Sequence, residues 1–182
     1  MRFVVALTGA SGQIYGFRIV EELAKRCDVY VIVSKNARII ADIEGLNVEY
    51  LKNLARIYDE DEMTAPISSG SFRHDGMVIA PCSMKTASSI AHGITNNLIT
   101  RSADVTLKEK RKLILLVRET PLHLGHLRTL VKLAEIGAII MPPVPSFYIK
   151  PKTVEDVVDY TVYRVLDILG VDVEYQRWEG LK

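Results

Sequence analysis

The amino-acid sequence predicts an α/β protein built on an open, mainly parallel sheet. Short apolar runs rich in Val, Ile and Leu alternate along the chain with longer stretches of helical periodicity, which is typical of repeated βα units. The runs show no polar alternation, so we expect helices to cover both faces of the sheet in three α/β/α layers. The first run leads into a glycine-rich turn, residues 8–12, that opens a helix as in Rossmann-like folds.

The expected strands are the apolar runs themselves. They lie at residues 2–7, 29–33, 76–80, 112–117 and 138–141. The stretches between and after them repeat apolar residues every three to four positions, as one face of a helix requires. These helices lie at residues 13–26, 35–44, 84–92, 97–110, 123–136 and 153–169. The last helix has the clearest ends, because Thr153 is a suitable N-cap and Gly170 a suitable terminator.

Residues 45–75 form the least regular part of the chain, and we expect a loop there. Residues 59–62 are four acids in a row. They are a candidate magnesium site or a solvated loop, and we favour the loop because a hard cation needs carboxylates that converge from several directions. We therefore expect no metal.

The composition is that of one globular domain, which we expect to span residues 1–182. Of the residues, 48% are hydrophobic and 25% charged, and 23 Lys and Arg against 22 Asp and Glu leave a net charge of +1. A charge this small gives no overall attraction to nucleic acid or anionic membranes. Cys27 and Cys82 have no Cys or His at ligand spacing nearby, which argues against zinc and favours reduced thiols in a cytoplasmic protein.

The chain also lacks the patterns of exported and membrane proteins. No signal region precedes the first strand, and no apolar run reaches the roughly 18 residues of a membrane span. The mean hydropathy of +0.14 is nevertheless high for a small domain. We expect the surplus apolar surface to be buried between subunits of a homo-oligomer.

Candidate functional residues follow the strands, because ligands of open parallel sheets bind beyond the carboxyl ends of the strands. After the first strand, the amides that open the helix could hold a phosphate or a flavin edge, although a tight turn needs glycine anyway. The glycines stand at 9, 12 and 16, and the second strand ends in Ser34 and Lys35 rather than in an acid for a ribose hydroxyl. NAD is therefore disfavoured.

The third strand is followed by a second candidate phosphate turn, residues 81–86. Ser83 can cap the next helix and Thr86 lies in its first turn, so this is either a plain cap or a binding site for a dianionic phosphate. Ser11 and Ser34 are expected at the same sheet edge. Together they favour a mononucleotide over a dinucleotide.

The last two strands suggest a second anion site. Arg118 and Glu119 follow the fourth strand, as a surface ion pair or as part of a site, and Arg101 and Lys108 flank the same helix and strand. The fifth strand leads into a proline-rich segment that carries Tyr148. A cluster of this kind can bind and protonate a phosphate leaving group.

With these motifs in order, the chain resembles the UbiX/Pad1 flavin prenyltransferases. These belong to a wider group of homo-oligomeric flavoproteins that includes cysteine-type decarboxylases. The resemblance covers nearly the whole chain. It is carried by the TGASG turn at 8–12, PCSMKT at 81–86, Arg118-Glu119, MPPVPSFY at 141–148, Arg164 and the closing Arg177-Trp178.

The resemblance implies a metal-independent enzyme. It would move a dimethylallyl group from dimethylallyl monophosphate to N5 and C6 of reduced FMN, and the prenylated FMN would serve a UbiD-type decarboxylase. The absence of an Asp-rich metal motif favours the monophosphate over the diphosphate as donor. The family is commonly dodecameric.

The resemblance also implies roles for individual residues. FMN would be bound by Gly9, Ala10, Ser11, Ser34, Ser83, Met84, Lys85, Thr86, Arg101 and Arg118. The donor would be bound by Lys108, Arg118, Tyr148 and Arg164, in a site that adjacent subunits share. Lys108 would stabilise the departing phosphate and Glu119 would protonate it, while Glu44 would handle a proton near the flavin with Ser11 as its relay.

Some positions depart from the family pattern, and two other functions stay open. Met63 or Thr64 stands where many relatives have a tryptophan, so an aromatic wall for the prenyl tail is missing. An FMN-dependent decarboxylase of the cysteine or phenylacrylate type is one alternative, although the cysteine type needs a histidine early in the chain and none precedes His74. A flavodoxin-like electron carrier is the other, and it would leave the cluster around Arg118 without a purpose. We expect His126 to be a packing residue.

Overall fold

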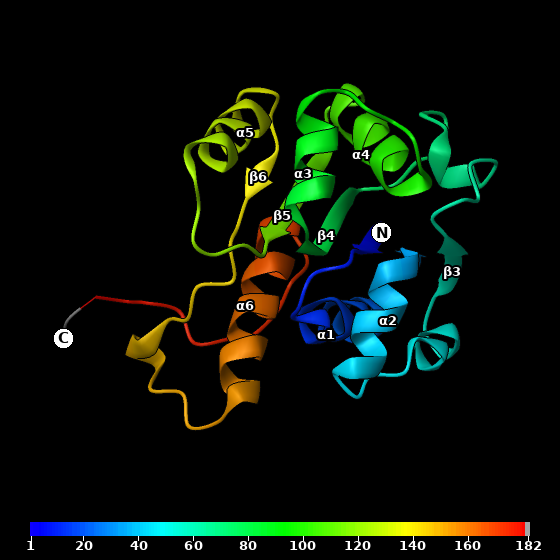
Figure 1. Cartoon of the computed structure of the whole chain (residues 1–182). Coiled ribbons are helices and arrows are strands. Elements are labelled where there is room, and N and C mark those ends of the chain that lie inside the picture. The colour runs from blue at the N-terminus through cyan, green and yellow to red at the C-terminus, as the bar shows by residue number, and fades with distance from the viewer. Residues whose placement is uncertain (181–182) are drawn as a thin grey trace.

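Six parallel strands form one open sheet between two layers of helices in the computed structural model, which describes residues 1–180 (Figure 1). In space the strands follow the order β3-β2-β1-β4-β5-β6. The strands are β1 (Arg2–Leu7), β2 (Asp28–Val33), β3 (Arg56–Asp59), β4 (Gly76–Cys82), β5 (Lys112–Val117) and β6 (Ile139–Ile140). The helices are α1 (Gln13–Ala24), α2 (Lys35–Ile43), α3 (Met84–Ala91), α4 (Leu98–Lys108), α5 (Leu124–Glu135) and α6 (Val154–Leu169). Short 3₁₀ helices are η1 (Val48–Asn53), η2 (Pro66–Ser68) and η3 (Phe147–Ile149).

The fold class and all predicted strands and helices are confirmed, and the irregular segment is corrected. Residues 45–75 contain β3, η1 and η2 instead of a plain loop. The composition of the sequence does not predict β3, because β3 is a short edge strand that pairs only with β2 and stays partly exposed. β4 also runs on to Cys82, past its predicted end at residue 80, with a register shift against β5 after Ile79.

Alternate residues of the strands face the two helical layers. In β1, Val5 and Leu7 belong to the core that α1 and α6 cover, whereas Val4 and Ala6 belong to the core beneath α3 and α4. In Figure 1, α1, α2 and α6 lie on one side of the sheet and α3, α4 and α5 on the other. Both faces of the sheet are therefore shielded from water, which explains why the strands are continuous apolar runs in the sequence.

The strand order reverses between β1 and β4, and Thr8 ties the two strands at that point. From β1 the chain moves outward to β2 and β3, then returns to β4 on the other side of β1. The Thr8 hydroxyl donates to the Pro81 carbonyl at 2.7 Å and accepts from the Ser83 amide at 2.8 Å. A crevice at the carboxyl ends of such strands is the usual ligand site of this architecture.

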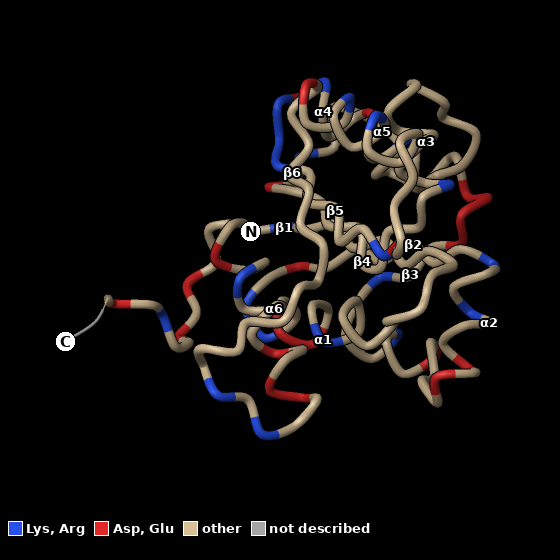
Figure 2. The backbone as a smooth tube through the Cα atoms, turned by 60° about the vertical axis from the view of Figure 1, so that its left-hand side comes forward, with Lys and Arg blue, Asp and Glu red and all other residues tan. Residues whose placement is uncertain are grey.

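Basic and acidic residues are distributed together over the molecule. Figure 2 shows Lys and Arg interspersed with Asp and Glu along the chain. No helix among residues 1–180 has the length and apolar character needed to cross a lipid bilayer.

Gly16 lets α1 approach β4, and a substitution there tests the packing. A Cβ atom at Gly16 would lie 2.2 Å from the Ala80 carbonyl oxygen, which belongs to rigid backbone. We expect Gly16→Ala to lower the free energy of unfolding by about 2–3 kcal/mol, because the helix must move off the sheet. Urea denaturation measures this change in the free energy of unfolding.

Gly70→Ala is the matched control, since a Cβ there meets only the flexible ends of Glu109 and Lys108. Equal unfolding free energies for the two variants would contradict the packing argument.

The two free cysteines lie in different environments, and their reactivity tests the burial of β4. Cys82 is fully buried, and burial raises the pKa of its thiol from 9.0 to about 12. Because the folded pKa lies above the unfolded one, stabilisation by the neutral thiol is present below pH 9 and lost as the pH rises towards 12.

At pH 8.5 we expect iodoacetamide to alkylate partly exposed Cys27 in the folded protein and Cys82 only after unfolding in urea. Mass spectrometry of the tryptic peptides measures both reactions. Labelling of Cys82 at the rate of Cys27 in the folded protein would contradict the burial.

Candidate functional site

A cleft of about 280 Å³ lies at the carboxyl edge of the sheet, where the strand order reverses. We call it the switch-point cleft. It gathers five of the predicted cofactor residues, from three different strand ends. Its lining is Thr8, Gly9, Ser34, Lys35, Asn36, Glu60, Ser83, Lys85, Thr86, Ser89, Asn96, Asn97, Ile99 and Thr100.

The N-terminus of α3 gives this cleft the chemistry of a phosphate site. Ser83 caps the helix by accepting from the Thr86 amide at 3.4 Å, and its hydroxyl lies 3.2 Å from that of Thr86. The first-turn amides of a helix have no helical acceptor, and the helix dipole adds positive potential there. With Lys85 also in its lining, the cleft suits the dianionic phosphate of a mononucleotide.

The N-terminus of α1, in contrast, binds a carboxylate of the chain itself. Glu44, the residue that ends α2, accepts from the Gly12 and Gln13 amides, both at 2.8 Å. Two amides of this helix N-terminus are thus already bonded to a carboxylate, and the phosphate or flavin edge expected there stays a prediction. Gln13 also stabilises the turn between β1 and α1, because its side-chain amide donates to the Thr8 and Ala10 carbonyls, both at 2.7 Å.

The acidic run of residues 59–62 is paired rather than merely solvated. Glu60 accepts from the Lys35 amide at 2.8 Å and from the Asn97 side chain at 2.9 Å, so it closes one side of the switch-point cleft. Asp59 and Asp61 pair with Arg38 and Lys35, each at 2.6 Å. Sequence reasoning missed Glu60, because four consecutive acids give no signal of which one faces inward. Within residues 1–180, no three His, Cys, Asp or Glu side chains are grouped as a metal would need.

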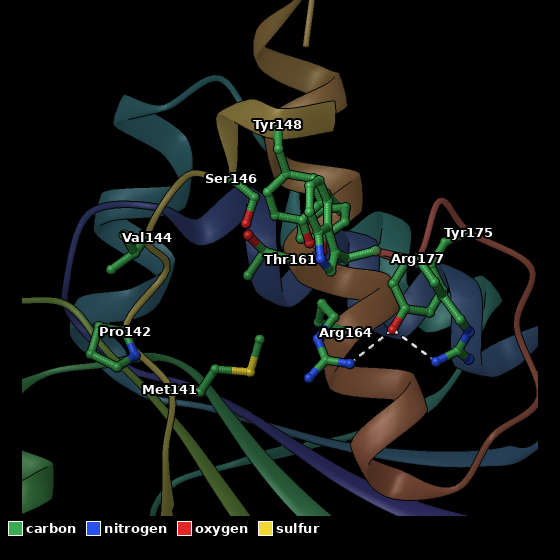
Figure 3. Close-up of a pocket in the computed structure, with 11 residues that line it drawn as sticks. Met141, Pro142, Val144, Ser146, Tyr148, Thr161, Arg164, Tyr175 and Arg177 are labelled. Atoms are coloured by element: carbon green, nitrogen blue, oxygen red, sulfur yellow. Dashed lines mark hydrogen bonds between the residues drawn. The ribbon is translucent and has the colours of Figure 1, made fainter. Parts of the chain in front are cut away.

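A second cavity, of about 510 Å³, lies between residues 141–148, α6 and the segment that follows α6 (Figure 3). We call it the α6 cavity. Two predicted donor-binding residues, Tyr148 and Arg164, line this cavity. The Tyr148 hydroxyl is hydrogen-bonded to that of Tyr160. The complete lining is Met141, Pro142, Val144, Ser146, Tyr148, Tyr160, Thr161, Arg164, Tyr175, Arg177 and Trp178.

Arg164 supplies a fixed positive charge to the α6 cavity. Its Nη1 donates to the Tyr175 hydroxyl at 2.8 Å and to Asp167 Oδ2 at 2.9 Å. The hydrogen bond to Tyr175, followed by the charges of Tyr175 and Asp167, raises the pKa of the Arg164 guanidinium. A guanidinium beside tyrosine hydroxyls is suited to bind a phosphate monoester.

Eight predicted residues line neither cavity: Ala10, Ser11, Glu44, Met84, Arg101, Lys108, Arg118 and Glu119. Arg118 follows β5 at the carboxyl edge and is exposed. Glu119 is also exposed, and within residues 1–180 it accepts from the Thr120 amide at 3.2 Å. Arg101 donates to the Ser68 carbonyl at 3.1 Å and pairs with Asp104 at 3.0 Å, so it anchors the turn η2. The Met84 side chain is buried in the core, which leaves its backbone for ligand contact.

Lys108 and Arg118 do not belong to one cluster within a single chain. Lys108 ends α4 four residues before β5 begins, at the amino edge of the sheet, where it contacts Glu109. Arg118 follows the last residue of β5, and a strand of six residues spans about 20 Å. The expectation of one cluster is therefore wrong for an isolated chain, because β5 itself separates its members.

Comparison with known proteins places this arrangement in a family. Residues 1–166 match the family model described as Flavoprotein. The flavin prenyltransferase UbiX of Archaeoglobus fulgidus is 58% identical over 181 residues, covering 98% of this chain and 100% of that protein.

Solved structures give the same result. AnUbiX, in complex with FMN and dimethylallyl pyrophosphate, matches with a TM-score of 0.96 and 42% identity, over 100% of this chain and 98% of that one. The dodecameric FMN-dependent UbiX-like decarboxylase of Escherichia coli O157:H7 matches with a TM-score of 0.94 and 40% identity over 100% of both chains. The chain therefore belongs to the flavoprotein family and, within it, to the UbiX flavin prenyltransferases.

Proposed function

We propose that this chain transfers a dimethylallyl group from dimethylallyl monophosphate to N5 and C6 of reduced FMN. The observation that carries the proposal is the presence of two separate cavities with basic side chains in their linings, the switch-point cleft and the α6 cavity. One reaction that needs both is the joining of a flavin phosphate with a prenyl phosphate. The flavin and prenyl donor bound together by AnUbiX support this assignment.

FMN is assigned to the switch-point cleft. Its phosphate fits the N-terminus of α3, with Ser83, Thr86 and Lys85 around it and Ser34 across the cleft. Gly9 lets the turn after β1 pack against α2 at one side of the cleft, because a Cβ there would lie 2.4 Å from the Cβ of Asn36. When bound, reduced FMN supplies N5 and C6 as the two prenyl acceptors. Further contacts are assigned to Ala10, Ser11, Arg101, Arg118 and the Met84 backbone.

The donor phosphate is assigned to the α6 cavity. Arg164 and Tyr148 line this cavity and are assigned to bind the phosphate. Lys108 and Arg118 are assigned to complete the shared site from different chains, because β5 separates them within one chain. As the allylic carbon–oxygen bond breaks, negative charge grows on the phosphate, and fixed guanidinium groups stabilise it at no cost in reorganisation.

Two carboxylates are assigned to proton transfer. Glu119 is exposed and, within residues 1–180, accepts from its neighbouring amide, so it can turn and protonate the departing phosphate. Glu44 is assigned to proton handling near the flavin, with Ser11 as its relay; it accepts from the Gly12 and Gln13 amides, which follow Ser11 in the chain.

The product indicates which class of enzyme would use it. Prenylated FMN is a cofactor, so we assign a UbiD-type decarboxylase as its recipient. We infer a homo-oligomer, a dodecamer as in the E. coli relative, and a cytoplasmic location, which the two free thiols support.

The decarboxylase of the cysteine type is disfavoured by the position of the first histidine. His74 precedes β4 at the amino edge of the sheet and is buried, with Nδ1 3.1 Å from the Gly76 carbonyl oxygen. It therefore lies buried at the edge opposite the switch-point cleft of its own chain, and no histidine precedes it in the sequence.

The activity test is an anaerobic incubation of the protein with reduced FMN and dimethylallyl monophosphate. We expect mass spectrometry to find a flavin heavier by one five-carbon unit, and dimethylallyl diphosphate in a parallel incubation to give less product. Full occupancy by FMN without any heavier flavin would overturn the proposal.

Replacement of Glu119 tests the proton donor. We expect Glu119→Gln to retain FMN but to slow prenyl transfer by about 10²-fold or more, because the phosphate would leave unprotonated. Single-turnover kinetics measures the rate. Glu135→Gln, an exposed acid at the end of α5, is the control with the same charge change. Equal rates for both variants would remove Glu119 from the mechanism.

Mixed oligomers test whether subunits share the donor site. Lys108→Ala and Arg164→Ala should each be inactive, because each removes one cation from every site. Mixing, dissociating and reassembling the two variants should restore part of the activity, since some sites then receive both cations from different chains. Mixed oligomers, verified by native mass spectrometry, that remain inactive would place both cations in one chain's site.

A further inference from the structure

Asp167 lies in the last turn of α6 and links three side chains of the α6 cavity. Its Oδ2 accepts from Arg164 Nη1 at 2.9 Å, from the Tyr175 hydroxyl at 2.9 Å and from Arg177 Nη1 at 3.0 Å. Its Oδ1 accepts from Arg177 Nη2 at 2.7 Å. One carboxylate thus joins a predicted donor-binding residue to the segment that follows α6.

The carboxylate is fully charged at neutral pH. The hydrogen bond from Arg177, followed by that from Tyr175, lowers the pKa of Asp167 from 3.8 to about 2. Because the folded pKa is the lower one, the contribution of this group is present above about pH 4 and is lost as the pH falls towards 2. The link is therefore intact under any condition in which the enzyme would act.

Asp167 and Tyr175 fix the direction in which Arg164 presents its donors. Both bind Nη1, and among the described residues Nε and Nη2 of Arg164 make no hydrogen bond. Figure 3 shows the Arg164 guanidinium on the cavity side of α6, in the space that Met141 also borders. A guanidinium held at one nitrogen keeps its remaining donors available for a phosphate and loses less rotamer freedom on binding.

Asp167 also holds the wall of the cavity. The segment after α6 has buried anchors at Val171 and Val173, but Arg177 and Trp178 further along are exposed. Trp178 packs its ring edge-to-face on Tyr148, with centroids 5.4 Å apart. Arg177, next to Trp178, is tied to Asp167 by a bidentate pair and lies over the Tyr175 ring at 4.5 Å, so Asp167 helps to hold Trp178 beside the cavity.

From these contacts we infer that Asp167 is a positioning residue for the prenyl donor, which aims Arg164 into the α6 cavity and holds residues 175–178 as its wall. The inference rests on the proposed function in assigning the prenyl donor to this cavity. The direction in which donor binding changes when Asp167 loses its charge distinguishes a positioning role from a purely electrostatic one. Removing a negative charge near an anion site should by electrostatics alone tighten anion binding, whereas loss of positioning should weaken it.

The test compares Asp167→Asn with wild type, as FMN-loaded enzyme. We expect the KM for dimethylallyl monophosphate to rise about tenfold with kcat changed by less than about threefold, because binding rather than chemistry loses its support. Retention of FMN should be unchanged. Trp178 is the single tryptophan of the chain, so acrylamide quenching of its fluorescence reports on the wall directly, and quenching should increase.

Asp167→Glu keeps the carboxylate and should restore most of the wild-type KM and quenching. Asp172→Asn, an exposed acid in the same C-terminal segment, is the control with equal charge change and should match wild type. An Asp167→Asn enzyme whose KM is unchanged or lower, or one that loses FMN in parallel, would overturn the inference.

The quenching measurement separates this inference from the proposed function. A wild-type enzyme that makes no prenylated flavin would refute the function, while an unchanged Trp178 signal in Asp167→Asn would refute the role of Asp167 in holding the wall.

Discussion

The parallel pairing of β1 with β4, tied at their carboxyl ends by Thr8, is the constraint on which the rest of the structure depends. It forces the chain to leave β1 on one side and to return on the other, so a crevice opens where the strand order reverses. The loops after β1, β2 and β4 all end at this crevice. Residues far apart in sequence, such as Gly9, Ser34 and Ser83, therefore line one cleft.

The same parallel arrangement sets the limit of what one chain can assemble. Helices between parallel strands run back from the carboxyl edge to the amino edge, so α4 carries Lys108 away from Arg118. A donor site that needs both cations must take one from another subunit. The apolar residues exposed along α5, including Leu124, Leu127 and Val131, provide surface for such contacts. In the proposed function, oligomerisation therefore completes the donor site.

The sequence predicted most of the fold because both faces of the sheet are buried and leave a strong apolar pattern. It missed β3, whose edge position removes that pattern. At the site, turns that follow strands were predictable, since topology alone brings them together. Pairings between side chains were not: Glu44 on the α1 amides, Glu60 across the cleft and Asp167 beneath Arg164 depend on how loops pack. Family resemblance pointed to Arg164 and Tyr148, but nothing in spacing or periodicity identified their partner Asp167.

In the proposed function, two phosphate-bearing molecules bind in two different cavities and react where subunits meet. The decisive experiment is a structure of the assembled oligomer with FMN and dimethylallyl monophosphate. We expect the flavin phosphate at the N-terminus of α3, the donor phosphate on Arg164 and Tyr148, and a Lys108 side chain from a neighbouring subunit within hydrogen-bond distance of that phosphate. Both phosphates in the switch-point cleft, or a donor phosphate bound with Lys108 remote from it in every subunit, would refute the two-cavity arrangement.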